Sequence, residues 1–140
     1  VIGIYIFYNL VYALLAWPAG RLADKFGLKK IFIAGLLCFM VTYVGFAFNN
    51  SIAGFILLFV FYGLYAAATE GIAKAWIANT VKGSETATAI GTYTGFQSIA
   101  ALFASSFAGW LWYVFGPATA FISSGMMCGI VILYFILQRK

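Results

Sequence analysis

Five long apolar stretches, separated by only a few polar residues each, constrain this 140-residue chain more than any other feature. A helix needs about 20 residues to cross the roughly 30 Å hydrocarbon core of a membrane. The stretches cover approximately residues 1–18, 31–48, 52–80, 85–115 and 118–138. Because backbone polar groups in lipid must be paired within the spanning segment, such runs form helices. The sequence therefore predicts an all-α integral membrane protein with five transmembrane helices.

Composition supports a place in lipid. Hydrophobic residues make up 65% of the chain, charged residues only 8%, and the mean hydropathy is +1.04. These proportions leave too little polar surface for a soluble protein. The net charge of +5 could indicate nucleic-acid binding, but the basic residues lie at the ends of apolar runs rather than along one stripe. We expect the lipid bilayer as a partner and no nucleic acid.

Cofactor and metal chemistry find little support in the sequence. Cys38 and Cys128 both lie inside apolar runs, and the chain has no histidine. Their spacing fits neither a metal site nor a disulfide. We expect no cofactor and no bound metal.

Basic residues mark one side of the membrane. They occur in the first connection, in the third connection and at the carboxyl end, and the second and fourth connections contain none. Lysine and arginine in short connections favour the cytoplasmic side. The basic connections and the C-terminus are therefore predicted to be cytoplasmic, in a multi-pass protein of the cytoplasmic membrane. The residues concerned are Arg21, Lys25, Lys29, Lys30, Lys82, Arg139 and Lys140.

The chain begins within an apolar run, at Val1, without an initiator methionine or a polar leader. An odd number of spans and a short basic tail follow. We therefore expect residues 1–140 to form a single incomplete transmembrane domain, the closing portion of a longer helical membrane protein.

The first connection carries the most specific motif. It consists of Gly20, Arg21, Asp24, Lys25, Gly27, Lys29 and Lys30. This pattern resembles the loop motif of the major facilitator superfamily, although Leu28 stands where a basic residue is usual. The stretches 8–12, 69–75 and 108–117 also resemble the closing half of bacterial members. The resemblance implies helices eight to twelve of a twelve-helix bundle, and helices two to six of the same pseudo-repeated fold stay open as an alternative.

The resemblance implies a function as well. Members are secondary active transporters that move a small solute by alternating access, so we expect a small-molecule substrate, the missing N-terminal half as a partner, and no enzymatic activity. Coupling to a proton is left open. The motif would act as a gate latch, in which ion pairs and Asp24 at a helix amino terminus lock helix ends together. Charges that only set the topology are the alternative.

Polar residues within the spans indicate which helices face a wet cavity, because a buried polar group in lipid needs a partner or water. They gather in the first, third and fourth spans, while the second and fifth are nearly bare and are expected to face lipid. Candidate cavity-lining residues share helix faces at three- or four-residue spacing. These are Tyr5, Asn9 and Tyr12 in the first span and Tyr93 and Gln97 in the fourth.

Glu70 is the strongest single candidate for substrate binding or coupling. It lies ten residues from the inner end of its span, or about 15 Å deep, where a charge is costly and usually functional. Lys74 follows at i+4 on the same face. An ion pair between the two that only stabilises the helix is the alternative.

Small residues predict where the helices pack closely. Gly63, Ala67, Gly71 and Ala75 recur every four positions in the third span. A similar ridge in the fourth span contains Thr94, Ser98, Ala101, Ser105 and Ala108.

Two other classes of protein stay possible on the sequence alone. A non-catalytic membrane scaffold or subunit could use the same packing surfaces. An integral-membrane enzyme is disfavoured, because three acidic residues, no histidine and no clustered cysteines leave little for a catalytic site.

Overall fold

The structure, a computed structural model, describes residues 2–138 as five long helices and one short 3₁₀ turn. Each of the five helices is long and apolar enough to cross a membrane, which confirms the predicted all-α, five-span architecture. The helices are α1 (Ile2–Phe26), α2 (Leu28–Phe48), α3 (Ile52–Thr80), α4 (Thr86–Phe115) and α5 (Pro117–Leu137), with the turn η1 at Gly83–Glu85.

The first helix is longer than its apolar stretch. The sequence predicts an end near residue 18, but α1 continues to Phe26, so Gly20–Phe26 is helical and not a loop. Alanine, arginine, leucine and lysine in this segment are strong helix formers, and charge alone does not end a helix. Asp24 consequently lies in the last turn of α1, which corrects its expected place at a helix amino terminus.

Two glycines make the sharpest breaks between helices. Gly27 separates α1 from α2 with φ 99°, and Gly116 separates α4 from α5 with φ 88°. Residues with a Cβ avoid such positive φ values, so glycine is required at both turns. Pro117 then begins α5, where the missing backbone N–H needs no partner.

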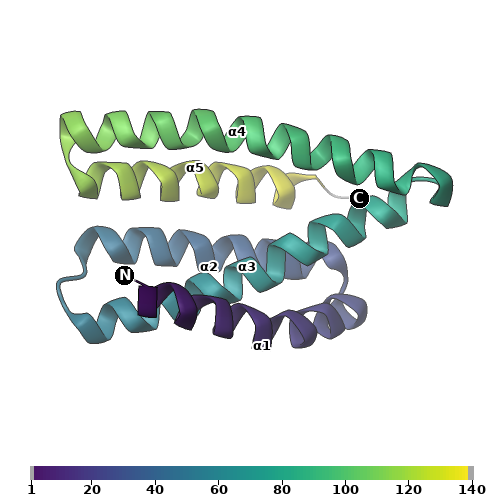
Figure 1. Ribbon diagram of the computed structural model, residues 1–140, viewed down its shortest axis with the longest axis horizontal. Coiled ribbons are helices and arrows are strands. Elements are labelled where there is room, and N and C mark those ends of the chain that lie inside the picture. The colour runs from purple at the N-terminus through teal and green to yellow at the C-terminus, as the bar shows by residue number, and fades with distance from the viewer. Residues whose placement is uncertain (1, 139–140) are drawn as a thin grey trace.

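Helix α2 lies at the centre of the arrangement, with α3 packed on one side and α5 on the other (Figure 1). Helix α1 packs mainly against α3, and α4 runs beside α5 as an antiparallel pair. The nearly bare α2, which the sequence predicts to face lipid, is therefore a packing centre of the described chain.

Close approach between helices depends on small residues. The buried core is richest on α3, where Ala66, Ala67, Ala68, Thr69 and Ala73 are all buried. A Cβ at Gly35 of α2 would lie 2.9 Å from Ala68 Cβ, so α2 and α3 touch almost backbone to backbone.

The small residues predicted to pack in α3 do so only in part. Gly63 and Ala67 are buried, but Gly71 and Ala75 are exposed. The ridge of small residues in α4 is also open, and Leu111 is the one buried residue of that helix. Helix α4 thus contacts little of the described chain besides α5.

Candidate functional site

The candidate residues of α1 and α3 meet on one face of the molecule. The carboxylate of Glu70 accepts a hydrogen bond from the Tyr12 hydroxyl, with 3.3 Å between Oε2 and Oη. This contact joins residues 58 positions apart in sequence. Two residues selected separately from sequence therefore form one interhelical pair.

Glu70 has no cationic partner in the described chain. Lys74 is exposed one turn away, but no lysine or arginine nitrogen of residues 2–138 comes within the 4.0 Å of Glu70 that an ion pair requires. Glu70 and Lys74 thus form no ion pair in the part of the chain that the structure describes. Glu70 is itself exposed at the surface of the five-helix arrangement.

Asn9 and Tyr5 lie on the same side of α1 as Tyr12. The Asn9 side-chain amide donates a 2.8 Å hydrogen bond to the backbone carbonyl of Tyr5, and Asn9 is half-buried. Tyr5 is 67% exposed. Its ring lies 6.4 Å from that of Tyr8, centroid to centroid.

A cluster of aromatic rings joins α1, α3 and α2 beside the Tyr12–Glu70 pair. The Tyr8 ring lies 5.1 Å from Tyr62 of α3, and Tyr62 lies 5.6 Å from Tyr65. The contacts continue into α2, where Phe39 and Tyr43 stack with ring centroids 4.0 Å apart. The sequence marks the tyrosines of α1 and α3 as polar residues within the spans but does not predict that they form one cluster. The sequence signal that could have indicated the cluster is the spacing of tyrosines on single helix faces. Tyr8 and Tyr12 are four residues apart in α1, and Tyr62 and Tyr65 are three residues apart in α3.

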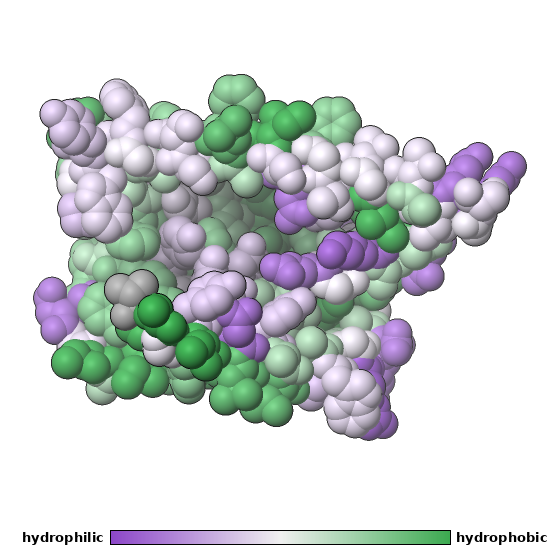
Figure 2. All heavy atoms as spheres, viewed as in Figure 1, coloured by the Kyte–Doolittle hydropathy of each residue, from purple (hydrophilic) through white to green (hydrophobic). Residues whose placement is uncertain are grey.

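Tyr93 and Gln97 are not brought to the Tyr12–Glu70 pair by direct contact. Tyr93 lines a separate apolar pocket together with Phe32, Trp76 and Phe135. Gln97 is exposed on α4. Figure 2 shows hydrophilic residues gathered over α3 and α1 on this face, and a hollow between them and α4.

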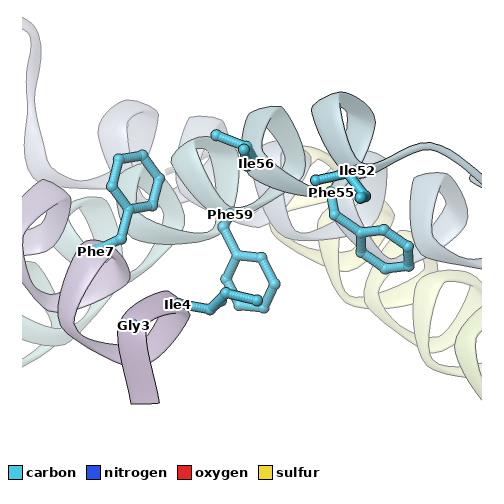
Figure 3. Close-up of a pocket in the computed structure, with 7 residues that line it drawn as sticks. All are labelled: Gly3, Ile4, Phe7, Ile52, Phe55, Ile56 and Phe59. Carbon is cyan, nitrogen blue, oxygen red and sulfur yellow. The ribbon is translucent and has the colours of Figure 1, made fainter. Parts of the chain in front are cut away.

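A groove between α1 and α3 opens at the end of the molecule away from the basic motif. It is lined by Gly3, Ile4, Phe7, Ile52, Phe55, Ile56 and Phe59 (Figure 3). All of these residues are apolar or lack a side chain. The groove offers no group that could recognise a polar solute.

The basic motif spreads over two helices. The guanidinium of Arg21 lies 4.9 Å from the Trp17 ring centroid, and the Lys25 ammonium lies 5.4 Å from that of Phe26. Lys29 donates a hydrogen bond to the backbone carbonyl of Gln138, just after α5.

The other motif residues have fewer contacts. Asp24 and Lys30 are exposed, and Asp24 has no lysine or arginine nitrogen within 4.0 Å in residues 2–138. Neither Gly20 nor Gly27 has a neighbour within 4 Å of where a Cβ would stand. In the described chain, the motif thus joins the start of α2 to the end of α5.

Comparison with known proteins gives one family. The family model described as Major Facilitator Superfamily matches residues 1–140. An uncharacterized MFS-type transporter of Methanocaldococcus jannaschii is 33% identical over 136 residues, which cover 95% of this chain and 34% of the relative. The MFS-type transporter ppzB of Metarhizium majus is 30% identical over 113 residues, or 81% of this chain and 25% of that relative.

The chain thus spans about a third or less of the length of these relatives. No solved structure matches it.

Proposed function

Because this chain belongs to the major facilitator superfamily, we propose that it is part of a secondary active transporter that moves a small solute by alternating access. The chain would supply the later helices, eight to twelve, and the N-terminal half of the same protein would complete the central path. Its five membrane-length helices and its transporter-named relatives support this proposal.

The observation that carries the proposal is the Tyr12–Glu70 pair. Glu70 lies ten residues from the end of α3, or about 15 Å, in a helix of membrane length. A carboxylate at that depth belongs on the wall of a wet path rather than against lipid. Asn9, Tyr12 and Glu70 thus form one wall of the proposed solute path.

The basic motif supports the orientation and the gate. Lysine and arginine at this end favour the cytoplasmic side, and in the proposed orientation α1 runs inward. Lys29 ties α2 to the end of α5, and Asp24, exposed in the last turn of α1, would pair with a cation outside the described chain when the cytoplasmic side is closed. Breaking that pair would accompany opening.

The test is solute flux through the full-length protein in proteoliposomes under an imposed proton gradient. The panel contains radiolabelled sugars, amino acids, organic cations and organic anions. We expect saturable flux of one class, reduced at least about tenfold in Glu70→Gln, because the lost charge lies on the path.

Glu85→Gln is the matched control, since it removes an exposed carboxylate from the connection between α3 and α4. It should leave flux unchanged. Absence of flux for every class would reject the transporter and favour a scaffold. Unchanged flux in Glu70→Gln would support the transporter but would show that Glu70 does not line the solute path.

A further inference from the structure

The few charged residues lie at different depths along the helices. Of the three acidic residues in the chain, Asp24 and Glu85 lie at helix ends, and Glu70 lies deep within α3. Lys74 is six residues from the end of the same helix, about 9 Å, a distance that a lysine side chain largely covers by extending to the membrane surface. Glu70 is therefore the one deep charge that must find its partner inside the membrane.

The neighbours of Glu70 supply a neutral donor and aromatic rings. Tyr12 donates one hydrogen bond to Oε2, which leaves the negative charge of the carboxylate uncompensated. The rings of Tyr8 and Tyr62 pack beside one another with an interplanar angle of 39°. Aromatic faces carry negative potential and attract a cation that lies within about 6 Å.

Asn9 adds an acceptor to the same wall. One N–H of its amide donates to the Tyr5 carbonyl, and its side-chain oxygen accepts no hydrogen bond within residues 2–138. Glu70, Asn9 and the tyrosine rings thus present acceptors and negative faces. An anionic solute would meet repulsion at the Glu70 carboxylate.

We propose that the wall formed by Asn9, Tyr12, Glu70 and the rings of Tyr8 and Tyr62 binds an organic cation, with the positive group at the Glu70 carboxylate. This inference rests on the proposed function and names its substrate class. The apolar body of the solute would lie in the hollow that Figure 2 shows between this wall and α4. Figure 2 also shows that most of the hydrophilic residues around the hollow lie on the side formed by α1 and α3.

The test is equilibrium binding of radiolabelled tetraphenylphosphonium to the full-length protein purified in detergent. Two competitors of equal shape separate charge from hydrophobicity: phenyltrimethylammonium and its neutral isostere, tert-butylbenzene. We expect the ammonium to displace the probe at a concentration at least about tenfold lower than the isostere, because charge and cation–π attraction act only on the former. Equal displacement by the two would overturn the proposal, and this comparison needs no variant.

Variants locate the site on the wall. Glu70→Gln should weaken tetraphenylphosphonium binding at least about tenfold, and Tyr8→Leu about fivefold, while Tyr8→Phe, which keeps the ring, should weaken it less than Tyr8→Leu. Glu85→Gln is the charge-matched control and should bind normally. Each variant is compared at equal monodispersity on size-exclusion chromatography. Normal binding by Glu70→Gln would overturn the assignment.

Other solute classes give distinct results. Phenylalanine, a zwitterion, could displace tetraphenylphosphonium from the natural protein but not from Lys74→Met. That result would mean that the solute is a zwitterion held between Glu70 and Lys74, and not a cation. Flux of anions or sugars in proteoliposomes without cation binding would keep the transporter and reject the cation. Flux of no class at all would reject the proposed function itself.

Discussion

Gly63 sets the distance between α1 and α3. A Cβ at this position would lie 2.7 Å from Val11 Cγ1 and 3.4 Å from the Tyr12 backbone nitrogen. Gly63→Ala should therefore push α1 away and destabilise the protein by about 1–3 kcal/mol. The measurement is the fraction of full-length protein that stays monodisperse after heating in detergent.

Gly71 provides the matched control on the same helix. No atom lies within 4 Å of a Cβ placed there. Gly71→Ala should be neutral or stabilising, because alanine favours a helix over glycine by up to about 1 kcal/mol. Equal losses in the two variants would mean that glycine flexibility, and not close packing, matters at position 63.

The difference between these glycines explains why the small residues of α3 pack only in part. A four-residue step turns about 40° beyond a full helical turn, because each residue advances about 100°. Three such steps, from Gly63 to Ala75, move the stripe about 120° around the helix. A sequence pattern reveals the small residues, but the facing helix decides which of them are covered.

Long-range pairing limits what can be predicted at the site. Depth and charge are enough to select Glu70 from the sequence. Its hydrogen bond to Tyr12 joins residues 58 positions apart and depends on how α1 crosses α3. Helical periodicity places residues on one face of their own helix and says nothing of the facing residue.

At the scale of elements, Gly27 ends α1 and starts α2. Its φ of 99° and ψ of 139° suit glycine, so Gly27→Ala should cost about 1–2 kcal/mol. Reduced thermal stability of the full-length protein, measured by the same heating assay, is the expected result.

Gly20 is the control within the same motif. It is helical, and a Cβ at that position would have no neighbour within 4 Å, so Gly20→Ala should not destabilise. If Gly27→Ala behaved like Gly20→Ala, the turn would have enough freedom to accept a side chain.

Lys29 stabilises the carboxyl end of α5. Its ammonium donates to the carbonyl of Gln138, and a cation near a helix C-terminus is worth about 0.3–1 kcal/mol. Lys29→Met should speed hydrogen exchange of the amides in the last turn of α5, measured by mass spectrometry on the full-length protein.

Lys30→Met removes the same charge from the next position, which is exposed. Exchange in α5 should then stay at the natural rate. Faster exchange in both variants would point to the total charge of the motif rather than to the contact made by Lys29.

The sequence predicts that the five helices exist, but it does not predict where α1 ends. The predicted third span, residues 52–80, coincides with α3. The charged motif resembles a loop and so predicts an end of the first span near residue 18, yet α1 ends at Phe26. At about 1.5 Å per residue its 25 residues reach roughly 37 Å, so the charged turns extend beyond a 30 Å core.

At the scale of the whole molecule, the proposed orientation can be measured directly. Single cysteines at Ser84 and Asn50, in a full-length protein otherwise free of cysteine and thus including Cys38→Ala and Cys128→Ala, should react with an impermeant maleimide from opposite sides. We expect the Ser84 position to react in inside-out vesicles and the Asn50 position in intact cells, because basic connections face the cytoplasm.

Labelling with a permeant maleimide is the control for reactivity of both positions. The reverse pattern would invert the topology, and with it the assignment of the basic motif to the cytoplasmic gate.

The open face of α4 shows why the complete site could not be read from this sequence. Phe96 and Phe103 are each 71% exposed, and the small residues between and after them have no facing helix in residues 2–138. The chain covers 34% of one relative and 25% of the other. In the proposed transporter, the residues that face α4 across the solute path would come from outside residues 1–140, so a helix pattern within this sequence cannot predict them.

The connections between helices differ in length and therefore in conformational freedom. A single non-helical residue joins α1 to α2 and α4 to α5, at Gly27 and Gly116, whereas Val81–Glu85 lies between the ends of α3 and α4. A connection of one residue has few free backbone dihedral angles, so a movement of one helix is passed on to the other. The segment 81–85 is instead where the polypeptide could be cut and the two pieces co-expressed with the least loss of assembly.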